Sequence, residues 1–175
     1  KVDGQKMSKS LGNFYTIDDV MKRGFHPLAL RLLFLTAHYR SEMNFTWENL
    51  AGAQKSYEKL LKSIFMTAKD NETNIEDMSE LAKKYLQDFF LSLGNDLNTA
   101  KAISILWIVK NDNDLLEQER RTLLLEFDNV LGLGLDDPTK VIEEINQLSR
   151  EKQSEISEEI KQILEDRKAA RESND

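Results

Sequence analysis

Apolar residues recur every three or four positions through most of this chain, and the clearest run extends from Ile75 to Leu93. Residues at this spacing lie on one face of an α-helix, so the run predicts an amphipathic helix that ends at Gly94. Only two prolines and seven glycines interrupt the 175 residues, which leaves long stretches free to form helix. The sequence therefore predicts a mostly α-helical protein.

Capping residues and prolines mark where further helices begin. A hydroxyl side chain just before a helix can accept a hydrogen bond from a free backbone N–H group, and proline suits the first helical position. Thr16, Pro27 and Thr46 are placed in this way, each ahead of an apolar run. With glycine as a usual stop, we expect helices at 17–23, 27–37, 47–67 and 75–94, from Asn98 or Thr99 through Val109, at 114–131, from Pro138 through Leu148, and at 154–171.

A polar stretch at 68–74, with the sequence AKDNETN, lacks apolar periodicity and predicts a loop. It divides the chain into residues 1–66 and residues 67–175. Short loops between successive helices favour antiparallel neighbours. We therefore expect residues 67–175 to form an antiparallel helical bundle and residues 1–66 to form a smaller helical region.

The two parts differ in charge. Residues 1–66 hold 10 basic and 6 acidic residues, a net charge of +4, whereas residues 67–175 hold 14 basic and 25 acidic residues, a net charge of −11. The overall charge of −7 is unlike that of a typical nucleic-acid-binding protein. The second part would meet a polyanion only through local basic patches.

Several classes of site are excluded by composition. The chain has no cysteine, so it has no disulfide, thiolate metal site or cysteine nucleophile. The two histidines, His26 and His38, lack the spacing of metal ligands, and no metal site is expected here. No run reaches the roughly 18 apolar residues that a membrane span needs, and no signal-like segment opens the chain. We expect a cytoplasmic protein.

The segment from Lys6 to Ser10 is the candidate site for chemistry. Its two lysines, Lys6 and Lys9, are separated by small or flexible residues, and Gly12 follows at a position that suits a tight turn. Lysine donates to phosphate as a charged group without a rigid fork, and the hydroxyl groups of Ser8 and Ser10 add donors. This composition suits a mobile clamp on a polyphosphate. A solvated basic loop is an equally open interpretation.

The residues before this loop, Val2-Asp3-Gly4-Gln5-Lys6, suit a strand end or a hairpin turn, because Asp-Gly tolerates positive φ. An autonomous domain rarely begins in the middle of a turn. We therefore expect the natural protein to continue upstream.

The order of residues in the loop adds a family resemblance. Lys6-Met7-Ser8-Lys9-Ser10 resembles, letter for letter, the KMSKS signature of class I aminoacyl-tRNA synthetases. The resemblance implies a Rossmann catalytic domain upstream, with a HIGH-type motif, and a loop that closes over ATP and its Mg²⁺. It also implies that Lys9 contacts the ATP phosphates and stabilises the transition state. Lys6, Met7, Ser8 and Ser10 would shape the loop or add contacts to ATP.

Downstream segments resemble one subfamily, the cysteinyl-tRNA synthetases. The most specific is His-Tyr-Arg-Ser at 38–41, followed by Asn-Phe at 44–45. The segment Asn95-Asp96-Leu97-Asn98-Thr99 is similar to the family's Asp-Asp-Leu-Asn-Thr, from which Asn95 departs. Further similarities are Pro27-Leu28-Ala29-Leu30-Arg31 and the basic residues around Arg167, Ala169, Ala170 and Arg171.

This resemblance implies that residues 1–66 are the KMSKS loop and a stem-contact region at the end of the class I catalytic part. Residues 67–175 would be a tRNA-binding bundle of the DALR type that lacks its C-terminal tip. The intact enzyme would be a monomer that uses ATP, cysteine and tRNA(Cys), and its Zn²⁺ would lie in the missing catalytic half. The 175 residues alone are expected to be inactive.

Two alternatives stay open. One is an ATP-dependent ligase on the same scaffold that joins cysteine to an amino-sugar. The other is a helical binding module without catalysis. For single residues, we expect packing or capping roles for His26 and His38, an acidic partner for Arg31, core positions for Trp47 and Trp107, and either a tRNA contact or a domain-interface contact for Arg40.

Overall fold

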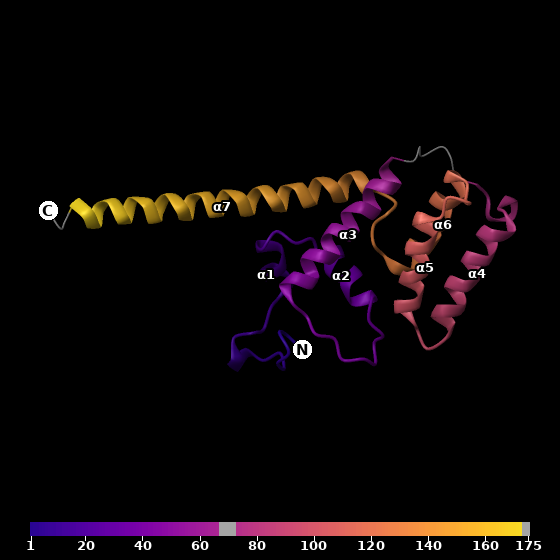
Figure 1. Ribbon diagram of the computed structural model, residues 1–175, viewed down its shortest axis with the longest axis horizontal. Coiled ribbons are helices and arrows are strands. Elements are labelled where there is room, and N and C mark those ends of the chain that lie inside the picture. Colours follow the sequence, from indigo (N-terminus) through magenta and orange to yellow (C-terminus); the bar gives the residue numbers. More distant parts are fainter. Residues whose placement is uncertain (67–72, 173–175) are drawn as a thin grey trace.

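The computed structural model describes residues 1–66 and 73–172, without the side chains of residue 159 and residues 167–172. These residues form no β-strand, and helices account for most of them (Figure 1). The predicted mostly α-helical class is therefore confirmed. In chain order the elements are η1 (Lys9–Leu11), α1 (Ile17–Lys22), α2 (Pro27–Leu35), α3 (Trp47–Phe65), η2 (Ile75–Asp77), α4 (Glu80–Gly94), α5 (Thr99–Asn111), α6 (Glu117–Leu131) and α7 (Pro138–Glu172).

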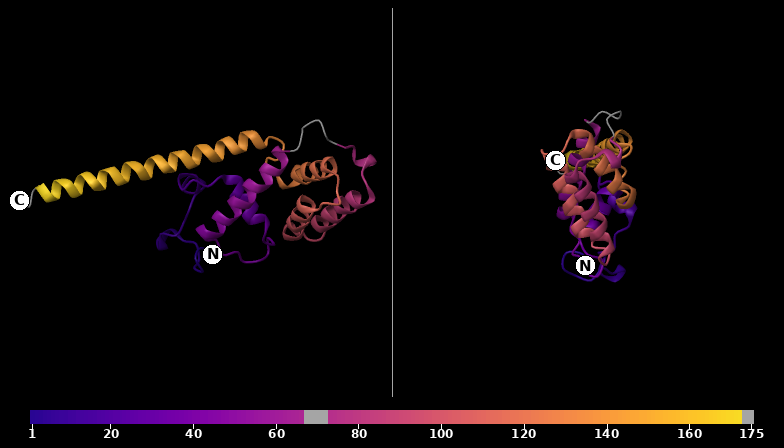
Figure 2. Two further views of the ribbon diagram at one scale, coloured as in Figure 1. Left: turned by 45° about the horizontal axis from the view of Figure 1, so that its top comes forward. Right: turned by 90° about the vertical axis from the view of Figure 1, so that its right-hand side faces the viewer.

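The helices form two groups, and a long final helix extends from the first of them. Helices α4, α5 and α6 pack against one another as a bundle, and α2 packs along α3 and also touches α5. Helix α7 begins beside α3, packs against α3 and α1, and then extends well beyond the other elements (Figures 1 and 2). The bundle predicted for the second half is thus confirmed for α4–α6, whereas α7 leaves it.

Helix starts follow the predicted caps closely. The hydroxyl of Thr16 accepts a hydrogen bond from the N–H of Asp19, and the Asp19 carboxylate accepts one from the N–H of Thr16, which forms a capping box. These bonds lower the pKa of Asp19. Thr46 caps α3 through the N–H of Asn49, and Asn98 caps α5 through the N–H of Lys101. The predicted domain boundary at 68–74 lies largely outside the described residues.

The single helix predicted at 75–94 is wrong at its start. Ile75–Asp77 forms a short 3-10 turn, Met78 is extended, and α4 begins only after Ser79. The hydroxyl of Ser79 accepts the N–H of Ala82, and the backbone N–H of Ser79 donates to the carboxylate of Glu119 on α6 at 2.6 Å. Because Ser79 is held by these contacts as an N-cap, the apolar periodicity before it does not continue as α-helix.

The two helices predicted after Pro138 are instead one. Helix α7 runs without a break from Pro138 to Glu172. The stretch 149–153, which separates the two predicted apolar runs, is polar but contains no glycine or proline. Polar residues such as Arg, Glu, Lys and Gln have good helix propensity, so loss of periodicity alone does not end a helix. The outer apolar residues of α7, Ile156, Ile160, Ile163 and Leu164, are between 38% and 64% exposed.

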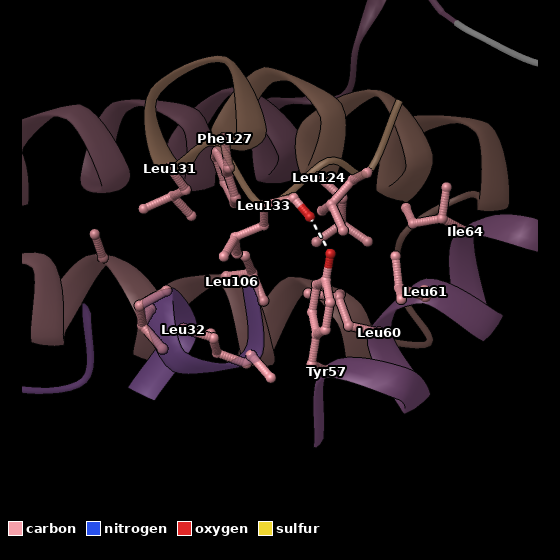
Figure 3. Packing of buried hydrophobic residues seen from close by; sticks show 14 of the residues in the cluster. Leu32, Tyr57, Leu60, Leu61, Ile64, Leu106, Leu124, Phe127, Leu131 and Leu133 are labelled. Atoms are coloured by element: carbon pink, nitrogen blue, oxygen red, sulfur yellow. Dashed lines mark hydrogen bonds between the residues drawn. The ribbon is translucent and has the colours of Figure 1, made fainter. Parts of the chain in front are cut away.

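Tyr57 on α3 connects the two helical groups at the centre of the core. Its ring is fully buried among residues of α3, α5 and α6 (Figure 3). Its hydroxyl donates to the backbone carbonyl of Leu133, just after α6. Burial, followed by the nearby Asp128 carboxylate, raises the pKa of Tyr57. The phenol therefore stays a hydrogen-bond donor and ties α3 to the connection between α6 and α7.

The connection between α6 and α7 is fixed by a buried carboxylate. Asp128 accepts the N–H groups of Leu133 and Leu135, the latter at 2.7 Å. Gly132 and Gly134 adopt positive φ of 61° and 69°, which only glycine adopts at little cost. Burial raises the pKa of Asp128 even though these bonds oppose the shift. The turn sets the direction in which α7 leaves the core.

Glu119 joins α4 to α6 and should make the fold sensitive to acid. It is 4% exposed, and its carboxylate accepts from the N–H groups of Ser79 and Leu116. Burial alone would raise the pKa of Glu119, but these hydrogen bonds outweigh it and lower the pKa below its ordinary value of 4.5. A carboxylate whose pKa is lowered by folding stabilises the fold above its unfolded pKa and loses that contribution as pH falls through the folded pKa.

We therefore expect Glu119→Gln to lower the free energy of unfolding at pH 7 by about 1.5–3 kcal/mol, the scale for hydrogen bonds to a charged group. The difference between the variant and the natural chain should shrink below the ordinary pKa of 4.5. Urea unfolding at pH 7, 5, 4 and 3 checks this. A difference that stays constant across this range would contradict the assigned role.

Candidate nucleotide-binding loop and its supports

The loop at Lys6–Ser10 starts from a turn that is held on residues 43–45. Val2 and Gln5 exchange backbone hydrogen bonds, and Asp3 and Gly4 adopt positive φ, as the Asp-Gly pair predicts. The N–H of Asp3 donates to the carbonyl of Phe45 at 3.0 Å, and the N–H of Gly4 donates to the side chain of Asn44 at 2.7 Å. The start of the loop is thereby attached to the segment just before α3.

The loop itself is closed by Asn13. The Oδ1 atom of Asn13 accepts the N–H of Ser8 at 2.8 Å, and its Nδ2 donates to the carbonyl of Lys6 at 3.1 Å. Ser8 then caps the short η1 helix, and the hydroxyls of Ser8 and Ser10 lie 2.7 Å apart. Gly12, with φ of 67°, ends η1. The asparagine was not among the site residues predicted from the sequence, although only Leu11 and Gly12 separate it from the motif.

The two lysines of the loop point into solvent. Both Lys6 and Lys9 are exposed, and neither has an ion-pair partner among the residues that the structure describes. The Nζ atom of Lys9 lies 5.5 Å from the ring centroid of Phe14, a cation–π contact. Both ammonium groups are therefore open to an anionic ligand.

An apolar cavity of about 580 Å³ lies beneath the loop, and Met7 contributes to its lining. The other lining residues come from the turn at the N-terminus, α1, α2 and the segment before α3, and include Val2, Tyr15, Val20, Phe34 and Phe45. Met7, 41% exposed, lies between the two lysines in sequence but borders this apolar surface. Because Met7 is apolar and lines this cavity, we expect it to position the loop rather than to bind phosphate.

An aromatic cluster holds the far end of the loop on α3. The ring of Tyr15 meets the ring of Trp47 edge-on with centroids 4.8 Å apart, and Phe25 stacks on Trp47 at 6.0 Å. The guanidinium of Arg23 lies 4.2 Å from the Trp47 ring centroid. Trp47 is thus packed as expected, although it is only partly buried. The contact of Arg23 with Trp47 was not predicted, because it depends on how the residue after α1 packs against the start of α3.

A second polar cluster brings together two distant motifs. The carboxylate of Asp96 contacts Arg40 at 3.1 Å, accepts from the Tyr39 hydroxyl at 2.8 Å and lies 3.7 Å from His38. Asp96 and Leu97 adopt positive φ of 56° and 49°. The hydrogen bond to Asp96 raises the pKa of Tyr39. The cluster joins the segment after α2 to the turn between α4 and α5.

Arg40, predicted as a tRNA contact or a domain-interface contact, contacts Asp96 in the turn between α4 and α5. Its side chain is still 68% exposed, and its Nε donates to the hydroxyl of Tyr39 at 2.9 Å. Two of its polar contacts are thus to protein groups, while much of the guanidinium faces solvent.

His26 and Arg31 support the fold. His26 is buried, caps α2 through the N–H of Leu28, and contacts the Glu144 carboxylate at 3.0 Å. This confirms the predicted capping role. The acidic partner predicted for Arg31 was wrong, because its Nε donates to the backbone carbonyl of Leu131 at the end of α6. A carbonyl at a helix C-terminus carries partial negative charge and can replace a carboxylate.

No group of three or more His, Cys, Asp or Glu side chains in the described part of the chain is arranged to hold a metal ion. None of the helices in the described part of the chain is both long and apolar enough to cross a membrane.

Comparison with known proteins supports the family resemblance of the Lys6–Ser10 motif. Residues 1–55 match the family described as tRNA synthetases class I (C) catalytic domain. Cysteine–tRNA ligase from Borrelia hermsii is 32% identical over 181 residues, which covers 97% of this chain and 36% of that protein. The corresponding protein from Borrelia turicatae is 34% identical with the same coverage, and that from Leptospira interrogans is 32% identical over 99% of this chain.

The similarity thus extends along nearly all of the chain, while the chain spans only 36% of the length of the first two relatives. The exposed KMSKS loop lies in the part that matches the catalytic domain. From these findings, the chain belongs to the cysteine–tRNA ligase family of class I aminoacyl-tRNA synthetases.

Proposed function

We propose that this chain is part of a ligase that activates cysteine with ATP and transfers it to tRNA(Cys). In the first step the cysteine carboxylate attacks the α-phosphorus of ATP, which forms cysteinyl-adenylate and releases pyrophosphate. In the second step a hydroxyl group at the 3′ end of the tRNA attacks the carbonyl carbon, and AMP leaves. The similarity of nearly the whole chain to cysteine–tRNA ligases carries the proposal.

The loop would act during the first step. Negative charge builds up on the departing pyrophosphate, and donors that are aimed at this charge lower the barrier. Lys9 is proposed to donate to the ATP phosphates, with Lys6 and the hydroxyls of Ser8 and Ser10 as further contacts and Met7 as part of the loop's seat. Solvent exposure of both lysines and the absence of an ion-pair partner among the described residues support these roles. Mg²⁺ would accompany ATP as part of the substrate.

The remaining assignments rest on the family. Arg40 is proposed to reach the tRNA backbone with the exposed part of its guanidinium while Asp96 orients it. Residues 1–66 would be the loop and stem-contact region, and residues 67–175 the tRNA-binding part. We expect the zinc of the family to lie outside this chain, and we propose that the reaction takes place in the cytoplasm.

Substrate dependence tests the proposed function. The full-length protein that contains this segment should catalyse ATP–pyrophosphate exchange only when cysteine is present, and it should charge tRNA(Cys) with labelled cysteine. An amino-sugar acceptor in place of tRNA tests the alternative ligase on the same scaffold. Transfer to the sugar but not to tRNA, or exchange without cysteine, would overturn the proposal.

The 175-residue chain alone should show no exchange above background. A loop that lacks the amino-acid pocket cannot align cysteine with ATP, and alignment supplies a large share of the rate. The measurement is ATP–pyrophosphate exchange by the purified chain at high enzyme concentration. Cysteine-dependent turnover would contradict the expectation that this chain is inactive by itself.

A further inference from the structure

The segment between α2 and α3 contacts two different parts of the molecule, one at each of its ends. At its beginning, the side chains of residues 38–40 all contact the carboxylate of Asp96, in the turn between α4 and α5. At its end, residues 44–45 hold the turn from which the Lys6–Ser10 loop starts. We call residues 38–45 the strap.

The loop end of the strap is joined to the first residues of the chain by three hydrogen bonds. The N–H of Phe45 donates to the carbonyl of Lys1 at 2.8 Å, and the N–H of Asp3 donates to the carbonyl of Phe45 at 3.0 Å. The side chain of Asn44 accepts from the N–H of Gly4 at 2.7 Å. Phe45 is itself buried. A displacement of this end of the strap therefore moves the start of the loop with it.

The other end of the strap is held by a turn with an unusual backbone. Asp96 and Leu97 adopt positive φ of 56° and 49°, a region that is costly for residues other than glycine. Such conformations persist where surrounding contacts fix them, and they concentrate at functional positions. This turn holds the Asp96 carboxylate against the strap. The hydroxyl of Thr99 adds a hydrogen bond to the carbonyl of Ala37, just before the strap, at 3.4 Å.

The middle of the strap is not packed flat against α3. A groove of about 610 Å³ lies there, and its lining comes from both the strap and α3 and includes Glu42, Met43, Gly52 and Ser56. A Cβ atom at Gly52 would meet no atom within 4 Å, so the groove is open at this point. The strap therefore has fixed ends and space behind its middle, which gives it room to shift as one piece.

We propose that Asp96 is a positioning residue for the Lys6–Ser10 loop and acts on it through the strap. Its carboxylate contacts the strap, and the strap holds the turn from which Lys6 and Lys9 are presented. A displacement of about 1 Å in a group that acts on the substrate can slow a reaction about 10²-fold. A small movement of the strap is therefore enough to affect the step in which ATP reacts. This inference rests on the proposed function.

The test uses variants of the full-length protein that disturb one end of the strap at a time. Asp96→Gly removes the carboxylate but keeps the turn, because glycine adopts positive φ at little cost. Asp96→Asn keeps an oxygen acceptor for the strap in a residue type that tolerates positive φ. Asn44→Ala removes the acceptor of the Gly4 N–H at the other end. The control, Glu80→Ala, removes an ion-paired carboxylate from α4.

We expect Asp96→Gly and Asn44→Ala each to lower kcat for cysteine-dependent ATP–pyrophosphate exchange about tenfold, while KM for cysteine changes less than about twofold. Asp96→Asn should stay within about threefold of the natural rate, and Glu80→Ala within about twofold. The double variant Asp96→Gly, Asn44→Ala should lose about tenfold rather than the roughly hundredfold of independent sites, because both changes release the same strap.

Hydrogen–deuterium exchange of the full-length protein gives a readout that does not depend on activity. The N–H groups of Asp3 and Gly4 are hydrogen bonded to the strap, and slow deuterium uptake reports such bonds. In Asp96→Gly, uptake in the peptide that contains both residues should quicken at least about fivefold, while uptake in α4 and α5 stays unchanged.

Unchanged uptake at Asp3 and Gly4, or losses of kcat that multiply in the double variant, would overturn the proposal. So would a loss in Glu80→Ala equal to that in Asp96→Gly. Faster uptake throughout α4 and α5 would also overturn it, because the effect would then come from an unfolded bundle.

The proposed function and the role of the strap can fail separately. If the full-length protein shows no cysteine-dependent ATP–pyrophosphate exchange, but Asp96→Gly still quickens deuterium uptake at Asp3 and Gly4, the function is wrong and the strap still positions the loop. If the activity is cysteine-dependent but the variants at Asp96 and Asn44 match the natural rate, the role of the strap is wrong and the function stands.

Discussion

Replacing Lys9 by alanine in the proposed full-length ligase is expected to slow cysteine-dependent ATP–pyrophosphate exchange about 10²–10³-fold, the scale for losing one donor to transition-state charge. The lysine is exposed, and its ammonium group makes a cation–π contact with the ring of Phe14. Its removal should therefore leave folding unchanged. The effect should appear in kcat more than in KM, because the charge develops during the reaction.

Lys22→Ala is the matched control. Lys22 is also an exposed lysine, on the neighbouring helix α1, and its removal makes the same change in charge. The control should exchange at a rate within about twofold of the natural protein, because loss of one distant surface charge is weakly felt. If the Lys9→Ala variant catalyses exchange at a rate within about twofold of the natural protein, the proposed role of Lys9 is wrong.

Phe89→Ala should have the largest effect on stability, lowering the free energy of unfolding by about 3–5 kcal/mol. Phe89 on α4 is fully buried and stacks on Phe127 of α6 with ring centroids 4.0 Å apart and planes 10° from parallel. Truncation leaves a cavity at the contact between these helices, which the surrounding side chains fill only in part. The loss should appear in the unfolding of the α4–α6 bundle.

The neighbouring residue provides the control. Phe90 is 46% exposed, although it is chemically identical and adjacent in the chain. Phe90→Ala should cost less than about 1 kcal/mol, as surface substitutions usually do. Urea unfolding followed by circular dichroism checks both variants. Similar losses for the two would contradict the packing of α4 on α6.

Local signals in the sequence were sufficient to predict most helices. Thr16, Thr46 and Asn98 cap their helices through the expected backbone N–H groups. Such caps act within four residues, so they can be read without knowledge of the tertiary fold. Apolar periodicity identified the core faces for the same reason, since Tyr57, Phe89 and Phe127 are all fully buried.

The errors arose where a partner distant in sequence decides the local structure. The late start of α4 depends on Glu119, which lies 40 residues after Ser79. The acceptor of Arg31 is a backbone carbonyl 100 residues away, and a backbone carbonyl carries no residue-type signal. The prediction of two helices in place of α7 was wrong for a different reason. A polar interruption in the sequence is compatible with a loop and also with an exposed helix.

The candidate site was predictable in part. The motif at Lys6–Ser10 is explicit in the sequence, but the role of Asn13 in closing the loop requires the three-dimensional structure. Likewise, the segments around Arg40 and Asp96 each resemble the family in sequence, and only the fold brings them into contact. Their roles towards ATP and tRNA stay predictions.

The most direct measurement is the rate at which an amine-reactive reagent modifies Lys6 and Lys9 in the proposed full-length ligase, followed by mass spectrometry. We predict that ATP and cysteine together slow modification of both lysines, most strongly Lys9, while Lys83 and Lys84 on α4 react at unchanged rates. Equal reactivity of Lys6 and Lys9 with and without the substrates would contradict a loop that grips the nucleotide.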